Sequence, residues 1–280
     1  MAEWQEGYVE SNGIRLHYTR TGGDDKVPVV LAHGITDNGL CWSRFARELE
    51  DYCDFIMVDA RGHGLSDKPE SGYGPRDHAA DLAGLIQALG LNKPLVIGHS
   101  MGAATASVLT AEYPGLVEAA VLEDPPWYWP LSPEEDAAKQ RQNYELMRAR
   151  IEERRALPAE ELWKQGLVAN PTWAPEEFDA WVLAKQQVVP QVAEFVLLND
   201  RTWPQQVAAY SVPVMLIYGE PERGGLVSPA IAAEAKGIND LVLPRQIPGA
   251  GHNIRREQLV EFRASVREFL AYLRRNNSRE

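Results

Sequence analysis

The stretch VIGHSMGA, residues 96–103, places a serine between two glycines, directly after an apolar run. The apolar residues predict a buried strand at 94–98, and the spacing after the serine predicts a helix over 101–113. A serine on such a sharp strand-to-helix turn holds its hydroxyl clear of the backbone, at the edge of a sheet. Glycines two residues to either side let strand and helix cross closely. Ser100 is therefore the candidate nucleophile.

Strand and helix signals alternate on both sides of this stretch. The signals predict strands at 8–11, 14–19, 27–33, 55–59, 94–98, 118–123, 214–218 and 241–247, and helices at 40–49, 75–89, 101–113, 228–236 and 257–274. This alternation is typical of an α/β fold, with a mostly parallel sheet that helices cover on both faces. Asn12-Gly13 suits the tight turn of a hairpin between the first two strands.

The alternation stops after Asp124 and returns near residue 205. Between these points the sequence has helical periodicity and no strand signal, with helices expected at 132–155, 158–168, 175–188 and 192–199. We expect residues 1–124 and 205–280 to form one core domain and residues 125–204 to be inserted as an all-helical cap. A segment inserted at this point usually covers a site at the strand ends.

Composition excludes several classes of function. The 280 residues carry a net charge of −12, which argues against nucleic acid or an anionic membrane as a partner. No apolar run approaches the length of a membrane span, and the first residues lack the pattern of a signal peptide. Cys41 and Cys53 are expected to be reduced thiols in a cytoplasmic protein. No HExxH, CxxC, Walker or GxGxxG pattern occurs, so neither a metal nor another cofactor is expected.

Four motifs follow one another along the chain: His33-Gly34, the glycine turn at 59–66, the GHSMG stretch at 98–102, and Gly251-His252. In this order they resemble the α/β-hydrolase superfamily, and the resemblance covers the whole chain. It implies an α/β-hydrolase fold, with a mostly parallel central sheet flanked by helices and an inserted helical cap. Related epoxide hydrolases and haloalkane dehalogenases use aspartate where this chain has Ser100, so the resemblance favours a serine hydrolase.

The positions of two loops along the chain indicate the oxyanion donors and the catalytic base. The backbone N–H groups of Ile35, after a buried strand, and of Met101, after the nucleophile, are the expected oxyanion donors. His33 and Gly34 belong to the same loop and are expected at the substrate pocket. His252 follows the last strand, and the chain order of nucleophile, acid and histidine makes it the expected base.

Four carboxylates are candidates for the acid that would orient His252 and complete a Ser-His-acid triad. By resemblance, it stands three residues beyond the glycine that ends the strand at 214–218, which makes Glu222 the preferred choice. Glu220 stands beside it and becomes the acid if the register moves. Some members of the superfamily instead use the end of the strand before the cap, where this chain has Glu123 and Asp124. The sequence alone leaves the choice among these four open.

Aromatic and basic side chains are frequent in the insertion. Trp127 and Trp129 directly follow the strand at 118–123 and are expected to reach the roof of the pocket, whereas most other aromatic residues are expected to pack the cap onto the core. An aromatic roof suits an apolar or aromatic substrate. The basic run Arg148, Arg150, Arg154 and Arg155 is interpreted as a solvated helix face, balanced by glutamates.

These features predict a cofactor-free serine hydrolase that cleaves a carboxylic ester or lactone of a small to medium apolar or aromatic substrate. The reaction would use a Ser-His-acid triad and an acyl-enzyme. The alternatives are a cofactor-free haloperoxidase or perhydrolase, a C–C bond hydrolase, and a slow-turnover ligand receptor on the same fold. The expected partner is a small-molecule substrate, and the chain is expected to be a monomer or a homodimer.

Overall fold

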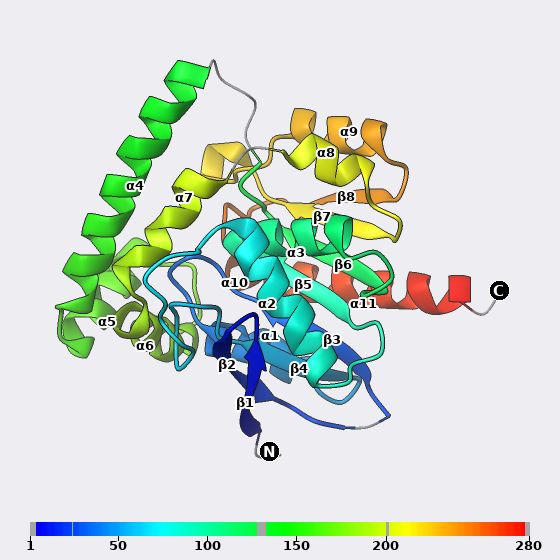
Figure 1. Ribbon diagram of the computed structural model, residues 1–280, viewed down its shortest axis with the longest axis horizontal. Helices are drawn as coiled ribbons and strands as arrows, with labels where there is room; N and C mark the ends of the chain where they lie inside the picture. The colour runs from blue at the N-terminus through cyan, green and yellow to red at the C-terminus, as the bar shows by residue number, and fades with distance from the viewer. Residues whose placement is uncertain (1–3, 24, 128–132, 200–201, 278–280) are drawn as a thin grey trace.

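An eight-stranded sheet forms the centre of the molecule (Figure 1). The structure is a computed structural model that describes residues 4–23, 25–127, 133–199 and 202–277. Its strands are β1 Gln5–Ser11, β2 Ile14–Arg20, β3 Val27–Ala32, β4 Cys53–Val58, β5 Leu95–His99, β6 Ala119–Glu123, β7 Val214–Tyr218 and β8 Val242–Gln246. Their spatial order is β1-β2-β4-β3-β5-β6-β7-β8. The pairs β1–β2 and β2–β4 are antiparallel and the others are parallel, which confirms the predicted mostly parallel sheet.

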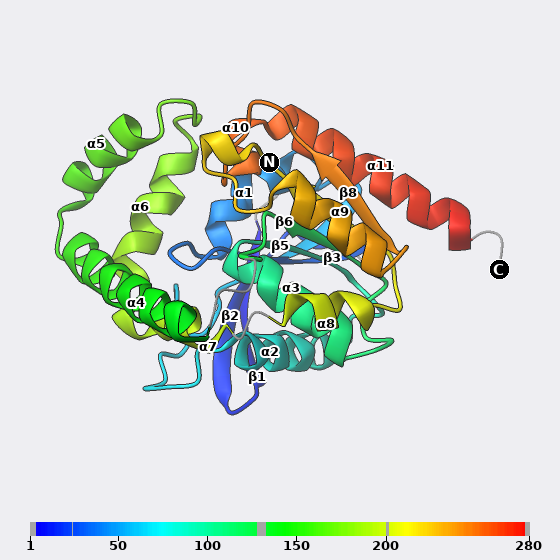
Figure 2. The ribbon, with the colours of Figure 1, turned by 90° about the horizontal axis from the view of Figure 1, so that it is seen from above.

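Helices cover both faces of this sheet (Figure 2). Side chains of α2 Pro75–Ala88, α3 Met101–Glu112, α8 Trp203–Ala208 and α9 Pro229–Ile238 pack into one apolar cluster with one face of the strands. The other face packs against η1 Gly39–Trp42, α1 Ser43–Arg47, α10 Ile254–Glu257 and α11 Leu259–Asn277. The central strands β5, β6 and β7 are buried along their whole length, as their continuous apolar sequence predicts.

The segment between β6 and β7 stands to one side of the sheet (Figures 1 and 2). The helices on that side are α4 Pro133–Arg155, α5 Ala159–Ala169, α6 Glu177–Gln187, η2 Pro190–Ala193 and α7 Glu194–Leu198, and we call residues 133–198 the helical insertion. The last helix of the segment, α8, belongs to the cover of the sheet. No strand occurs among the residues described between Glu123 and Val214. The predicted boundary at 204 and 205 falls within α8, which packs on α3 and α9, and the division into core and cap stays a prediction.

Local signals account for the turns better than for the short helices. Asn12 and Gly13 both have positive φ, 49° and 76°, as a two-residue hairpin turn requires. The helix expected at 40–49 is split into η1 and α1, and the helix expected at 257–274 is preceded by the separate helix α10. Helix α8 was not predicted at all, because a helix of so few turns leaves little periodicity. None of the described helices is both long and apolar enough to cross a membrane.

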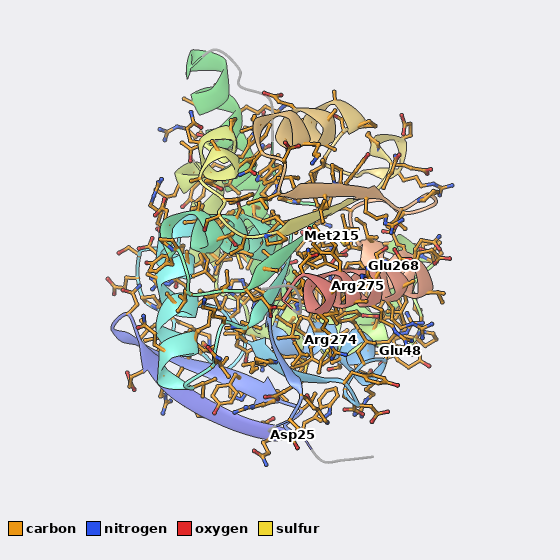
Figure 3. The ribbon with its side chains drawn as sticks, turned by 90° about the vertical axis from the view of Figure 1, so that its right-hand side faces the viewer. Asp25, Glu48, Met215, Glu268, Arg274 and Arg275 are labelled. Carbon is orange, nitrogen blue, oxygen red and sulfur yellow. The ribbon has the colours of Figure 1, made fainter. Side chains whose placement is uncertain are left out.

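Exposed ion pairs connect α11 to its neighbours at the surface. Arg245 of β8 pairs with Glu268, and Arg263 pairs with Glu48; Figure 3 labels both glutamates, beside α11. Both pairs are partly solvated, and such pairs contribute at most about 1 kcal/mol. The attachment of α11 therefore depends on its apolar side, where Phe262, Val266 and Phe269 are almost fully buried.

The backbones of β3, β5 and α3 approach one another closely where these elements meet. A Cβ atom on Gly98 would lie 2.1 Å from the carbonyl oxygen of Gly102, and one on Gly102 would lie 2.2 Å from the carbonyl oxygen of Ala32. Both neighbours are backbone atoms and cannot rotate away. Only glycine fits at these two positions, and the crossing sets the place of Ser100 between them.

Replacing Gly102 with alanine is therefore expected to lower the free energy of unfolding by about 3 kcal/mol or more, because β3 and α3 must separate to admit the methyl group. Gly237→Ala is the control, since Gly237 lies in α9 and a Cβ there meets nothing within 4 Å. That variant should be neutral or more stable, by up to about 1 kcal/mol. Urea unfolding followed by tryptophan fluorescence measures both, and equal stability of the two variants would contradict the steric argument.

Candidate active site

Ser100 occupies a strained turn between β5 and α3. Its φ of 53° and ψ of −114° lie in a region that residues with a side chain rarely adopt. The turn is fixed on both sides, because the Ser100 N–H donates to the carbonyl of Glu123 (2.9 Å) and its carbonyl accepts from the N–H of Ala104 (3.0 Å). Ser100 lines a cavity of about 630 Å³ that lies between the sheet and the helical insertion.

His252 lines the same cavity and is hydrogen-bonded to Asp124. The His252 Nδ1 atom lies 2.6 Å from Asp124 Oδ2. Because an ionised carboxylate can only accept, Nδ1 carries the proton, and the lone pair of the neutral ring is at Nε2. Asp124 is fully buried, whereas the side chain of His252 is 28% exposed.

The backbone of the β7–α9 loop holds the Asp124 carboxylate in place. The N–H groups of Leu226 and Val227 donate to it at 2.8 and 3.0 Å. With His252, this gives the carboxylate three donors, which offset the cost of its burial. The loop expected to supply the acid therefore supplies main-chain donors to an acid from the neighbouring strand.

The preferred expectation for the acid is thus not met, because Glu222 does not reach His252. Glu222 lies in the exposed turn η3 Pro221–Arg223, and the adjacent Glu220 forms a partly exposed pair with Arg223 (2.7 Å). Glu123 is fully buried but points elsewhere, accepting from the backbone N–H (2.8 Å) and Nη1 (3.2 Å) of Arg255. Of the four candidates, Asp124 is the one that the structure brings to His252.

Ile35 and Met101 lie on the cavity wall beside Ser100. Among the described residues, neither of their backbone N–H groups donates to a protein acceptor, so both are available to a ligand. The ring of His63 steadies this loop, with Nε2 lying 2.8 Å from the carbonyl oxygen of Ile35. The two N–H groups expected to bind the oxyanion therefore stand free beside the nucleophile.

His33 and Gly34 have different positions. Gly34 lines the cavity, whereas the buried ring of His33 turns away from it to brace the loop. Its Nδ1 lies 2.9 Å from the Gly34 carbonyl, and its Nε2 accepts from the Ala60 N–H (3.0 Å). The expectation that His33 lines the pocket is therefore not met.

The expected aromatic roof also has a different composition. Trp127 is buried in the core, where its ring stacks on Trp203 with centroids 5.1 Å apart, and it does not line the cavity. Trp129 lies outside the described residues. Trp173 and Trp181, two of the aromatic residues expected to pack the cap onto the core, line the cavity. Their neighbours on the wall include both apolar and basic side chains, so the pocket is only partly apolar.

Known proteins share both the sequence pattern and the fold of this chain. The sequence pattern of the alpha/beta hydrolase family matches residues 29–264. The chain belongs to this family. It is 30% identical to the N-formylmaleamate deformylase of Pseudomonas putida, over 94% of this chain and 96% of that protein.

Two further likenesses support the same placement. A 2-(acetamidomethylene)succinate hydrolase of Mesorhizobium japonicum is 41% identical over 117 residues, a match that spans 41% of either chain. The crystal structure of an E-2-(acetamidomethylene)succinate hydrolase superposes with a TM-score of 0.80 at 24% identity, covering 96% of this chain and all of the other. This last likeness confirms the α/β-hydrolase fold.

In this alpha/beta hydrolase, buried charges join the insertion to the core at one wall of the cavity. The Asp37 carboxylate lies 3.1 Å from Arg256, 3.3 Å from Lys185 and 3.4 Å from Arg255. Burial favours the neutral acid, but these three cations together outweigh it and hold the pKa of Asp37 well below its ordinary value. Arg256 also pairs with Glu177 of α6 (3.2 Å).

Lys185 of α6 connects the insertion to the loop that carries Ile35. Its Nζ donates to the carbonyl (2.6 Å) and the hydroxyl (2.9 Å) of Thr36, the next residue along the chain. Burial lowers the pKa of Lys185 to about 8, and the charge of Asp37 offsets only part of that shift. The position of this loop therefore depends on the docking of α6.

The charged residues of the cavity were not predicted from the sequence. Arg148 pairs with Glu152 on a solvated face (3.2 Å), as interpreted, and Arg150 and Arg155 are exposed as well. Arg150 and the half-buried Arg154 also line the cavity. Their spacing of four residues, in register with Met147, was the signal that separates them from the rest of the basic run. The described residues contain no group of three or more His, Cys, Asp or Glu side chains placed to hold a metal ion.

Four buried histidines make the stability of this hydrolase sensitive to acid. Burial lowers the pKa of His63 to about 3 and also lowers the pKa values of His33, His78 and His99, so all four are neutral in the folded state. The unfolded chain takes up their protons below pH of about 6.5, which favours unfolding. Stability is therefore expected to fall as the pH drops from about 6.5 toward the lower folded-state pKa values, by up to about 1.4 kcal/mol per pH unit for each histidine.

Urea unfolding at pH 7.5, 6.5 and 5.5 measures this slope. His78→Gln should make it shallower by about one proton, because a glutamine side chain does not titrate. A wild-type stability that is flat between pH 6.5 and 5.5 would contradict the prediction.

Proposed function

We propose that the chain is a serine hydrolase that cleaves a carboxylic ester or amide bond through Ser100, His252 and Asp124. The observation that carries this proposal is the 2.6 Å contact between Asp124 and His252 Nδ1, which leaves Nε2 as the basic atom in a cavity that Ser100 also lines. The geometry supports the proposal, and so does the family, through its fold and its hydrolase members.

The first step is attack by Ser100 Oγ on the carbonyl carbon of the substrate. His252 Nε2 takes the hydroxyl proton, and the imidazolium is stabilised by the Asp124 carboxylate. The negative charge moves to the carbonyl oxygen, where the free N–H groups of Ile35 and Met101 can donate hydrogen bonds to it. Met101 is also the first residue of α3, so the positive end of that helix faces the charge.

The intermediate then collapses to an acyl-enzyme. His252 returns its proton to the leaving alcohol or amine, and the acyl group stays on Ser100 Oγ. Water, deprotonated by His252, attacks the ester that links acyl group and serine. The products are the carboxylic acid and the regenerated Ser100, and each proton that His252 takes up is returned within the cycle.

Two bond types fit this sequence of steps. The motifs favour an ester or lactone, for which the leaving group departs readily. The relative matched over nearly its whole length is a deformylase of N-formylmaleamate, and removal of an N-formyl group cleaves an amide bond. Amide hydrolysis is therefore the second candidate, with proton delivery to nitrogen by His252 as the step that it demands.

The other hypotheses stay open to the same assays. A perhydrolase would form peracid from acetate and peroxide faster than it hydrolyses esters. A C–C hydrolase would cleave a ketone and leave esters nearly untouched. A receptor would be labelled once at Ser100 and turn over a few times at most.

Ser100→Ala is expected to abolish hydrolysis of p-nitrophenyl butyrate, because the variant lacks the hydroxyl that forms the acyl-enzyme. A serine-directed phosphonate should add once to the wild type, at Ser100, as read by peptide mass spectrometry. Ser71→Ala, a change at an exposed serine, should keep full activity and full labelling. Activity that survives in Ser100→Ala would rule out the proposed nucleophile.

Asp124→Asn is expected to lower kcat by about 10⁴-fold, because an amide facing Nδ1 favours the wrong tautomer of His252. Glu222→Gln and Glu220→Gln should stay within about twofold of the wild type, since Glu222 is exposed and Glu220 pairs with Arg223, and neither hydrogen-bonds His252. Glu123→Gln leaves buried Arg255 without its full partner and should lower the melting temperature. Steady-state kinetics would contradict the assignment if Glu222→Gln lost more activity than Asp124→Asn.

A further inference from the structure

Two arginines of α4 belong to the cavity that Ser100 lines. Arg150 and Arg154 stand one helical turn apart, about 6 Å along the helix axis, on the face that also presents Asn143 and Met147 to the cavity. They place two guanidinium groups on the insertion side of the cavity, whereas Ser100 and His252 come from the sheet side.

Arg150 is exposed at the cavity, and Arg154 is half-buried. Among the described residues, no carboxylate lies within 4 Å of Arg150 or Arg154, although Arg148 on the same helix has Glu152. Burial and the nearby charge of Arg150 lower the pKa of Arg154, and the charge of Glu153 offsets only part of that shift. Like charges four residues apart on a helix repel each other, and a bound anion would relieve this repulsion.

The remaining charges at this wall already have partners. The carboxylates of Asp37, Glu123 and Glu177 face Lys185, Arg255 and Arg256 in a buried network, and Glu177 also pairs with the partly exposed Arg44 (3.8 Å). The network therefore has no charge to spare for α4. Arg256, which also lines the cavity, has one further feature: its buried Nη2 has no acceptor among the described residues.

Arg154 and Arg256 each lie over a tryptophan ring of the cavity wall. The guanidinium of Arg154 lies 5.4 Å from the ring centroid of Trp181, and that of Arg256 lies 4.4 Å from the ring centroid of Trp173. Stacking of this kind limits the freedom of a guanidinium, so less entropy is lost when it binds an anion.

We propose that Arg150 and Arg154 form an anion subsite of the cavity, which binds a carboxylate group of the substrate while its scissile carbonyl lies at Ser100. This inference rests on the proposed function and names the class of its substrate: a carboxylate-bearing ester or amide. The flat fork of a guanidinium matches the two oxygens of a carboxylate. A carboxylate is also small enough to share a cavity of about 630 Å³ with the rest of an acyl group.

Binding is tested without catalysis. Calorimetric titration of the Ser100→Ala protein with glutarate should show saturable binding, which the further change Arg150→Gln with Arg154→Gln weakens by roughly 10- to 100-fold. The matched control is Arg148→Gln with Arg155→Gln, which removes the same charge from the same helix at positions outside the cavity. Glutarate affinity in the control should equal that of the parent protein.

Selectivity is tested in the active protein with two esters of equal acyl length. The ratio of kcat/KM for mono-p-nitrophenyl glutarate to that for p-nitrophenyl pentanoate should exceed one in the wild type. It should fall roughly 10- to 100-fold in the Arg150→Gln, Arg154→Gln variant and stay constant in the control.

Three results would overturn the subsite: no glutarate binding at millimolar concentration, equal losses in the variant and its control, or inorganic phosphate displacing glutarate with equal affinity. Failure of the proposed function is a separate result. If neither ester is hydrolysed but glutarate binds in a manner that needs Arg150 and Arg154, the subsite stands and the hydrolase proposal falls.

Discussion

The contact of Gly102 with the Ala32 carbonyl is the constraint on which the rest of the site depends. Because β3, β5 and α3 pack backbone against backbone there, the chain must turn sharply at Ser100, and the positive φ of that residue is the result. The same contact brings the loop after β3 alongside the first turn of α3. The same backbone contact thus positions the nucleophile and the two free N–H groups. It lies between β3 and β5, where the strand order reverses.

The acid shows where prediction from sequence reaches its limit. The motifs around Ser100 and His252 indicate the fold, because local backbone chemistry alone makes them recognisable. Asp124 could only be kept among the alternatives, because its distance from His252 depends on how β6, β7 and β8 pair across 128 residues of chain. Glu222 had the expected spacing from Gly219, yet its turn faces solvent, and spacing along the chain does not report that.

The sequence predicted the helices of the insertion but not which of their faces line the cavity. Helical periodicity shows that Met147, Arg150 and Arg154 share one face, but whether that face meets solvent or a cavity depends on how α4 docks. The same holds for Trp127, whose place beside β6 suggested the pocket, although its ring stacks on Trp203 in the core. Chain position indicates the neighbourhood of these side chains, and long-range packing decides their direction.

The buried charges of α6 bear on how molecules enter and leave. Lifting α6 from the core would separate Lys185 from Asp37 and Glu177 from Arg256, and splitting buried pairs of this kind costs several kcal/mol. The cavity reaches the surface at α4, since Leu146 is 63% exposed and also lines the cavity. A substrate that enters beside Leu146 would not require these buried pairs to separate, so α6 could stay docked throughout the reaction.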